Sequence, residues 1–282
     1  NAISLSVTSW QVAAVIGPAL AGIIIGAATA ALGQNGVGVV YVIDALSFLA
    51  VIGALLLIRA RTLAAAARPA SVAAALEGLR FVFASPVMRG TMLLDFFATF
   101  FGASMLLMPI FATDILHVGA VGLGFLLAAP SAGAVISALV LAGRGTVRRQ
   151  GTAVLWGVAA YGLAWVVFGL SGNFWLALLA LAGTGAADTV SMVMRQTIRQ
   201  MTTPDELRGR MTSVNMIFFM GGPQLGEMEG GLIARVLSAP WAAITGGLGV
   251  LLVTGWVAWS NREIRDYTVL PAGPAAEPLA AD

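Results

Sequence analysis

Four carboxylates lie inside long apolar segments of this sequence, and they are the first candidates for chemistry. They are Asp95, Asp188, Glu227 and Glu229. A charged side chain at the centre of a membrane helix costs about 2.5–3.5 kcal/mol on insertion scales, so such residues commonly bind a substrate or carry a proton. We therefore predict that at least one of these acids takes part in proton coupling or lines a substrate cavity.

Glu227 and Glu229 form the leading candidate pair. Residues two positions apart are separated by about 200° around a helix, so both side chains cannot face one narrow cavity. One carboxylate can titrate while the other makes a structural bond, for which Arg235 at the outer end of the same segment is a partner. Structural pairing of both acids is the alternative, because ionic networks also occur away from functional sites.

The other two acids have different surroundings. Asp188 and Arg195 are seven residues apart and lie on one face of a helix. They form either a solvated ion pair that anchors an inner gate or a coupled switch. Asp95 lies about one and a half turns into its segment and faces either a central cavity or a neighbouring amphipathic segment.

Other chemistries are excluded by residues that the sequence lacks. It has no cysteine and a single histidine, His117, which excludes thiolate metal sites, disulfides and histidine metal cages. We find no phosphate-binding Gly-Lys-Ser/Thr loop and no nucleophile–base pair, so we expect no ATP-driven step, no enzyme, no cofactor and no metal. The net charge of +2 comes from arginines in loops, so no nucleic-acid partner is expected either.

The segments that hold these acids are long enough to cross a membrane. Hydrophobic residues make up 59% of the chain and charged residues only 10%, whereas soluble domains carry about 25% charged residues. A bilayer core about 30 Å thick needs about 20 apolar residues per helix. We therefore predict an all-α polytopic protein, in contact with membrane lipid, with eight spans at residues 4–32, 38–59, 90–116, 119–143, 151–171, 173–200, 212–236 and 239–260.

The arginines predict how the chain is oriented. Nearly all of them fall after the second, fourth, sixth and eighth spans, and Arg235 is the exception. Arginine-rich loops face the cytoplasm, so we predict a multi-pass protein of the inner (plasma) membrane with a cytoplasmic C-terminus. Asp205, Arg208 and Arg210 lie in one of these loops and, with Arg195, are candidates for contacts of a cytoplasmic gate.

The longest inner loop divides the spans into a group of two, in residues 1–60, and a group of six, in residues 90–261. Residues 61–89 are predicted to be a cytoplasmic loop that contains an amphipathic helix. The proline-rich residues 262–282 are predicted to be a disordered cytoplasmic tail. Because Asn1 is followed directly by an apolar span, we expect the sequence to be a fragment or to start internally.

A Gly-Pro pair recurs in two spans. The first span contains Gly17, Pro18 and Gly22, and the seventh contains Gly222, Pro223 and Gly226. Proline removes a helical hydrogen bond and kinks the helix, and inside a membrane a neighbouring helix or a cavity must satisfy the freed carbonyl. Kinks at corresponding positions indicate a duplicated fold, as in secondary transporters built from repeats.

Longer strings make the resemblance to one family specific. They are Asp44-Ala45-Leu46-Ser47-Phe48, Met108-Pro109-Ile110-Phe111, Thr203-Pro204-Asp205-Glu206-Leu207-Arg208-Gly209-Arg210 and Leu225-Gly226-Glu227-Met228-Glu229-Gly230-Gly231. With the Gly-Pro motif and the grouping of two and six spans, they resemble the major facilitator superfamily, in its enterobactin-exporter-like branch. The resemblance covers essentially the whole chain. It implies helices five to twelve of twelve, so that residues 1–60 are the last two helices of an N-terminal half and 90–261 are the C-terminal half.

This resemblance also implies a function. The expected activity is secondary export of small amphipathic compounds, of drug or siderophore type, by alternating access with proton antiport. The implied partners are a small-molecule substrate and protons, and the full-length protein is expected to be a monomer. The alternative is a non-transporting membrane scaffold or sensor with the same fold, which would need no titrating acid in a cavity.

Overall fold

The computed structural model describes residues 2–57, 72–102, 105–145, 147–204 and 207–268, and these residues form helices and no strand. The prediction of an all-α fold is confirmed. The long helices are α1 (Ala2–Leu32), α2 (Val37–Leu57), α3 (Val72–Ala84), α4 (Pro86–Gly102), α6 (Gly119–Arg144), α7 (Gln150–Leu170), α8 (Phe174–Thr202), α9 (Arg208–Val236) and α10 (Ala239–Ser260). Shorter helical turns are η1 (Gly33–Gly36), η2 (Met105–Leu107), α5 (Met108–Ile110), the π-helical η3 (Phe111–Ile115) and α11 (Arg262–Asp266).

Most of the predicted spans meet the length and hydropathy that a membrane crossing requires. Within the described residues, 7 segments do so: Ser9–Leu32, Val37–Leu57, Pro86–Ile115, Gly119–Arg144, Gln150–Leu170, Phe174–Thr202 and Ala239–Ser260. The predicted span 212–236 corresponds to α9, which is long enough at 29 residues but carries several charged residues that lower its hydropathy. The chain is a multi-pass membrane protein.

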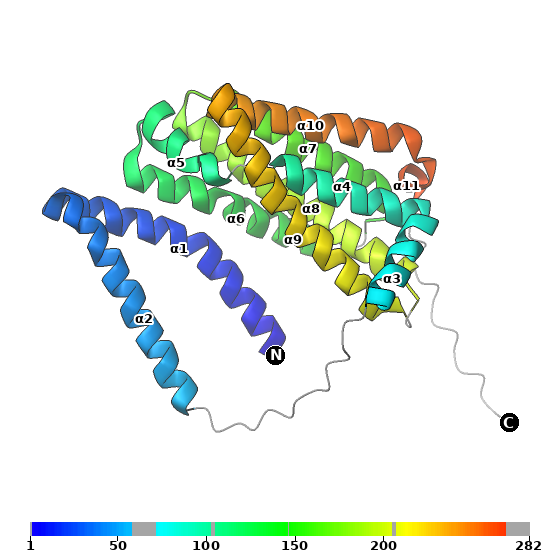
Figure 1. The fold of residues 1–282 in the computed structure, drawn as a ribbon, viewed down its shortest axis with the longest axis horizontal. Helices are drawn as coiled ribbons and strands as arrows, with labels where there is room; N and C mark the ends of the chain where they lie inside the picture. Colours follow the sequence, from blue (N-terminus) through cyan, green and yellow to red (C-terminus); the bar gives the residue numbers. More distant parts are fainter. Residues whose placement is uncertain (1, 58–71, 103–104, 146, 205–206, 269–282) are drawn as a thin grey trace.

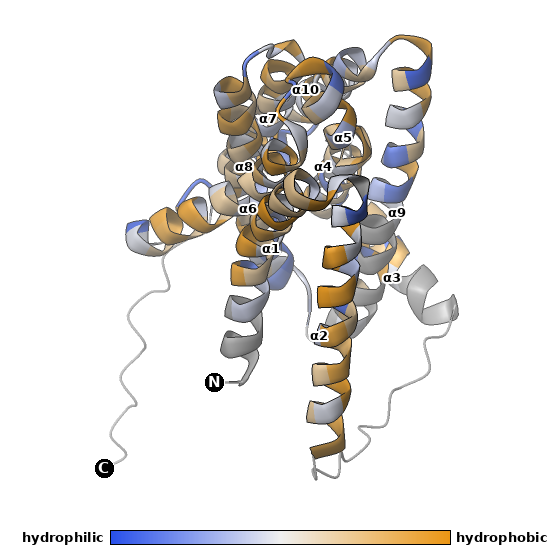
Figure 2. Cartoon of the chain, turned by 90° about the vertical axis from the view of Figure 1, so that its left-hand side faces the viewer, coloured by the Kyte–Doolittle hydropathy of each residue, from blue (hydrophilic) through white to orange (hydrophobic). Residues whose placement is uncertain are grey.

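The helices pack around α8, which contacts α6 on one side and α7 on the other. α7 packs in turn on α10, and α4 lies between α10 and α9 (Figure 1). α1 joins this bundle by packing along α6, whereas α2 diverges from it and has no buried residue (Figure 1). Figure 2 shows the apolar surface of α2, which suits contact with lipid or with another apolar helix.

Small residues allow α1 and α6 to approach closely. A methyl group on Gly22 would lie 2.7 Å from the carbonyl oxygen of Ala120 and 2.8 Å from Cα of Gly124. Gly17, in contrast, has open space around it. In a membrane, such close backbone contact is what holds apolar helices together. Of the predicted kink motif in α1, Gly22 is therefore the packing residue.

The second Gly-Pro pair also lies at a helix contact. Gly222 of α9 packs against α4, where a methyl group on it would lie 3.3 Å from the carbonyl oxygen of Phe96 and would collide with Oγ1 of Thr99. Pro18 and Pro223 are both inside their helices. Each motif thus holds a glycine that joins its helix to a neighbour, but at different positions: Gly22 follows Pro18 by four residues, whereas Gly222 directly precedes Pro223.

The start of the C-terminal tail differs from the prediction. Residues 262–266, expected to be disordered, form α11, which caps the arginine-rich end of the bundle. Nδ2 of Asn261 donates a hydrogen bond of 2.6 Å to the carbonyl oxygen of Pro86, and Oγ1 of Thr152 donates one of 3.0 Å to that of Arg265. Buried Ile264 completes the contact. The prediction failed because these bonds come from residues far away in sequence; residues 269–282 lie outside the described residues.

The α1–α6 contact can be tested with a matched pair of alanine substitutions. Gly22→Ala places a methyl group against the backbone of α6, and overpacking of this kind costs about 1–3 kcal/mol. We expect a lower midpoint of thermal unfolding in detergent for Gly22→Ala and no loss for Gly17→Ala, whose methyl group meets nothing within 4 Å. Equal midpoints for the two variants would contradict the close contact.

Candidate functional site

A buried arginine joins two of the predicted acids. Nη2 of Arg195 lies 3.0 Å from Oδ1 of Asp95 and 3.4 Å from Oδ1 of Asp188. Asp188 and Arg195 occupy one face of α8, as their spacing predicted, and Asp95 reaches them from α4. The side chains of Arg195 and Asp95 are 4% and 10% exposed, whereas that of Asp188 is 49% exposed.

A second arginine extends this network to a third helix. Nη1 of Arg199 lies 3.8 Å from Oδ2 of Asp95 and donates a hydrogen bond to Oδ1 of Asn215 on α9. Its Nη2 donates a hydrogen bond of 2.7 Å to Oε1 of Gln196. The network therefore ties α4, α8 and α9 together and combines two carboxylates with two guanidinium groups, so its formal charge is zero.

The two ion pairs of Arg195 are unequal. The pair with Asp95 is shorter and enclosed, so the attraction between its charges is screened less than that of the longer pair with half-exposed Asp188. Nε and Nη1 of Arg195 are enclosed and have no hydrogen-bond partner in the described part of the chain. Asp188 is therefore the partner that can leave Arg195 at the lower cost.

The network lines a cavity of about 550 Å³ between α4, α8 and α9. Most of the residues that line it have polar side chains, and Thr99, Thr197, Gln196 and Asn215 are among them besides the charged residues. A volume of this order lies within the range of small-molecule sites. It lies on the half of α8 nearest the arginine-rich end of the bundle.

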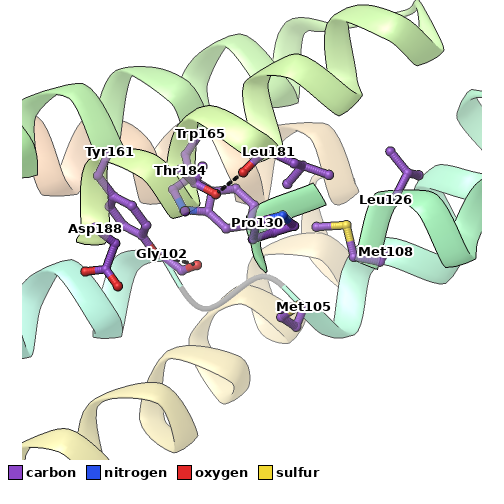
Figure 3. A pocket seen from close by; sticks show the side chains of 11 residues that line it. Gly102, Met105, Met108, Leu126, Pro130, Tyr161, Trp165, Leu181, Thr184 and Asp188 are labelled. Carbon is purple, nitrogen blue, oxygen red and sulfur yellow. Dashed lines mark hydrogen bonds between the residues drawn. The ribbon is translucent and has the colours of Figure 1, made fainter. Parts of the chain in front are cut away.

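A smaller and more apolar cavity, of about 180 Å³, begins where the first one ends. Asp188 lines both cavities. Figure 3 shows Asp188, Tyr161 and Gly102 at one end of the smaller cavity and Met108 and Leu126 at the other. The Tyr161 hydroxyl donates a hydrogen bond of 3.3 Å to the carbonyl oxygen of Gly102, where α4 ends.

The leading pair of the sequence analysis lies elsewhere. Glu227 and Glu229 are partly buried on α9, and neither lines the two cavities. Among the described residues, neither makes a salt bridge, and Arg235 is exposed and unpaired with them. Their part in proton coupling stays a prediction.

The other predicted gate residues lie beyond what the structure describes. Asp205 is outside the described residues, and so are the side chains of Arg208 and Arg210. No group of three or more His, Asp or Glu side chains that could hold a metal occurs among the residues searched, which are the described ones.

Sequence reasoning missed several residues of the site. Arg199 follows Arg195 by four positions and so shares its helix face, a signal that the spacing carried. Asn215 is an uncharged polar residue in an apolar helix, which is a weaker signal. Tyr161 and Trp165 carry no signal in the sequence, because α7 is apolar on all of its faces and no single residue stands out as functional.

Comparison with known proteins agrees with this architecture. The family model described as transmembrane secretion effector, within the major facilitator superfamily, matches residues 1–273. The chain belongs to this family. Two similar proteins are enterobactin exporter EntS from Escherichia coli and the protein of the same name from Shigella boydii. Each is 29% identical to this chain over 196 residues, which cover 70% of the chain and 47% of the exporter. The chain spans about half the length of the curated relatives that it matches.

The unequal ion pairs predict unequal stability losses. Removing one member of a buried ion pair costs about 3–5 kcal/mol, because it leaves the other charge uncompensated, whereas an exposed pair contributes about 0–1 kcal/mol. We expect Asp95→Asn to lower the midpoint of thermal unfolding in detergent clearly more than Asp188→Asn does. The double variant Asp95→Asn/Arg195→Gln should recover part of the loss. A larger loss for Asp188→Asn would contradict this order.

Proposed function

We propose that this protein exports small amphipathic compounds by alternating access, driven by proton antiport. One observation carries the proposal: Arg195 is shared between carboxylates of two helices at the wall of a cavity large enough for a ligand. A shared cation of this kind has two arrangements, one with both acids engaged and one with Asp188 released. Membership of the secretion-effector family supports export as the direction of transport.

The network suggests how a proton and a conformational change are coupled. Protonation of Asp188 removes its charge, so Arg195 keeps Asp95 alone as an ionic partner. The balance of contacts between α4, α8 and α9 then changes, and a two-state transporter responds by shifting towards the arrangement that favours the protonated acid. Asp188 can exchange its proton through either cavity, since it lines both.

The substrate is proposed to be a compound of drug or siderophore type. The relatives are named as enterobactin exporters, and the two cavities together offer polar and apolar walls to an amphipathic molecule. A scaffold or sensor of the same fold would need no acid in a cavity. The position of Asp188 on both cavities therefore favours the transporter over that alternative.

Uphill export tests this proposal directly. In proteoliposomes with an imposed pH gradient, the full-length protein should concentrate enterobactin, and Asp188→Asn should abolish concentration while downhill exchange continues, because Asn imitates the protonated acid. Asp114→Asn is the matched control, since Asp114 is exposed and hydrogen-bonded only locally, to Thr113. Uphill export by Asp188→Asn with the dependence of the wild type on the pH gradient would remove Asp188 from the mechanism.

The same assay separates Asp188 from the two glutamates. If Glu227 or Glu229 carries the proton instead, its Gln substitution should abolish uphill export and keep downhill exchange. The other Gln variant should reduce only the folded yield. We expect Asp188→Asn to have the larger effect on coupling, because Glu227 and Glu229 lie outside both cavities.

The orientation is a separate proposal and has its own test. The positive-inside rule places the arginine-rich end, which carries Arg144, Arg148 and Arg149, in the cytoplasm, together with the C-terminus. Cysteines introduced at Gly145 and Gly172, in the exposed turns that flank α7, should then behave oppositely in intact cells. An impermeant thiol reagent should label position 172 and spare position 145, and the reverse pattern would invert the topology.

A further inference from the structure

The smaller cavity has a carboxylate at one end although its walls are mostly apolar. Asp188 provides a full charge at one end, and its side chain is 49% exposed. Gly102 of α4 lines the same end of the cavity, and its carbonyl oxygen lies beside Tyr161. Tyr161 satisfies the Gly102 carbonyl with one hydrogen bond, and a carbonyl oxygen can accept two.

Aromatic rings and sulfur atoms form the adjoining walls. Tyr161 and Trp165 lie one turn apart on α7, with ring centroids 6.3 Å apart and planes at 78°. Met105 and Met108 line the pocket from the broken second part of the α4 span. The faces of tyrosine and tryptophan attract cations, and methionine adapts to varied ligand shapes.

The arginines of the network do not fully occupy Asp188, so its carboxylate can also bind the positive charge of a ligand. Arg195 has its stronger pair with Asp95 at 3.0 Å, so it keeps a partner when Asp188 turns away from the 3.4 Å contact. An anionic ligand finds no equivalent opening, because the unpaired Nε and Nη1 of Arg195 are enclosed. One feature points to a neutral ligand instead: Nε1 of Trp165 is buried and has no hydrogen-bond partner in the described part of the chain, so it could donate to a carbonyl group.

We infer that this pocket is a subsite for the head of an amphipathic organic cation, a quaternary or protonated amine, held by Asp188 and the rings of Tyr161 and Trp165. The rest of such a molecule extends past Asp188 into the larger cavity. The inference rests on the proposed function in one respect, because it assigns a substrate class to the same transporter. The cation and the coupled proton then compete for one carboxylate.

Equilibrium binding without any gradient tests the subsite apart from transport. The probes are phenyltrimethylammonium, a small aromatic cation, and N,N-dimethylbenzamide, a neutral molecule of similar size that offers a carbonyl to Trp165. Binding to the full-length protein in nanodiscs is measured by equilibrium dialysis, and uptake by empty nanodiscs is subtracted. We expect the cation to bind at least about tenfold more tightly than the amide, in line with a desolvated cation–π contact plus an ionic partner.

Substitutions locate the site. Asp188→Asn should weaken binding of the cation at least about tenfold and leave binding of the amide unchanged, which also shows that the variant is folded. Trp165→Phe should weaken the cation several-fold. The matched controls are Asp114→Asn and Trp175→Phe, whose side chains lie in exposed residues away from the pocket, and both should bind as the wild type does.

Three results would overturn the inference: equal binding of the two probes, tighter binding of the amide, or cation binding that is insensitive to Asp188→Asn. If Asp188→Asn does not fold, the comparison of the two probes on the wild type and on Trp165→Phe still decides. Failure of the proposed function looks different. In that case the cation binds with the expected dependence on Asp188, but a pH gradient concentrates neither enterobactin nor the cation.

Discussion

The buried guanidinium of Arg195 is the constraint on which the site depends. An ion enclosed in a protein is stable only when it is paired, and Arg195 sits 4% exposed with one firm partner, one looser partner and two unpaired donor nitrogens. Asp95 keeps a short ion pair with it when Asp188 turns away, although Asp95 also pairs with Arg199. Asp188 is thereby held close to a cation without being committed to it, and its side chain remains accessible from two cavities.

Close contacts at two glycines hold together helices near this network. Gly22 brings the backbones of α1 and α6 together, and Gly222 does the same for α9 and α4. α4 and α9 are also two of the three helices that the Asp95–Arg199–Asn215 contacts join. A shift of α9 along α4 would therefore change the contacts of Arg199 with Asp95 and Asn215. The same two helices also pack through buried side chains, Met88 and Met92 of α4 against Met211 and Val214 of α9, so the polar network acts together with an apolar contact.

The sequence predicted the helices well because membrane spans are local features. Length and hydropathy alone define them, and the spacing of seven positions from Asp188 to Arg195 placed both on one face of α8. Asp95 was predicted to be functional, but its pairing with Arg195 depends on the packing of α4 against α8, which no spacing within one helix reveals. Glu227 and Glu229 were ranked above it as carboxylates in an apolar span, but which acids line a cavity depends on how several helices pack. α11 was missed for the same reason, since Asn261 bonds to Pro86, which lies far away in the sequence.

The chemistry of the two cavities and the names of the relatives point to different molecules. The relatives are named as enterobactin exporters, whereas the smaller cavity of this chain offers a carboxylate and aromatic faces, both of which attract cations. Specificity is a difference between affinities, so a pocket of this kind discriminates against an acid as much as it favours an amine. At 29% identity, a fold and a direction of transport can be shared while a few residues around one cavity change the preferred charge. In the proposed mechanism, Asp188 sets the preference for the charge of the substrate. A cationic substrate can replace Arg195 as the partner of this carboxylate, as a proton can, whereas an anionic substrate cannot.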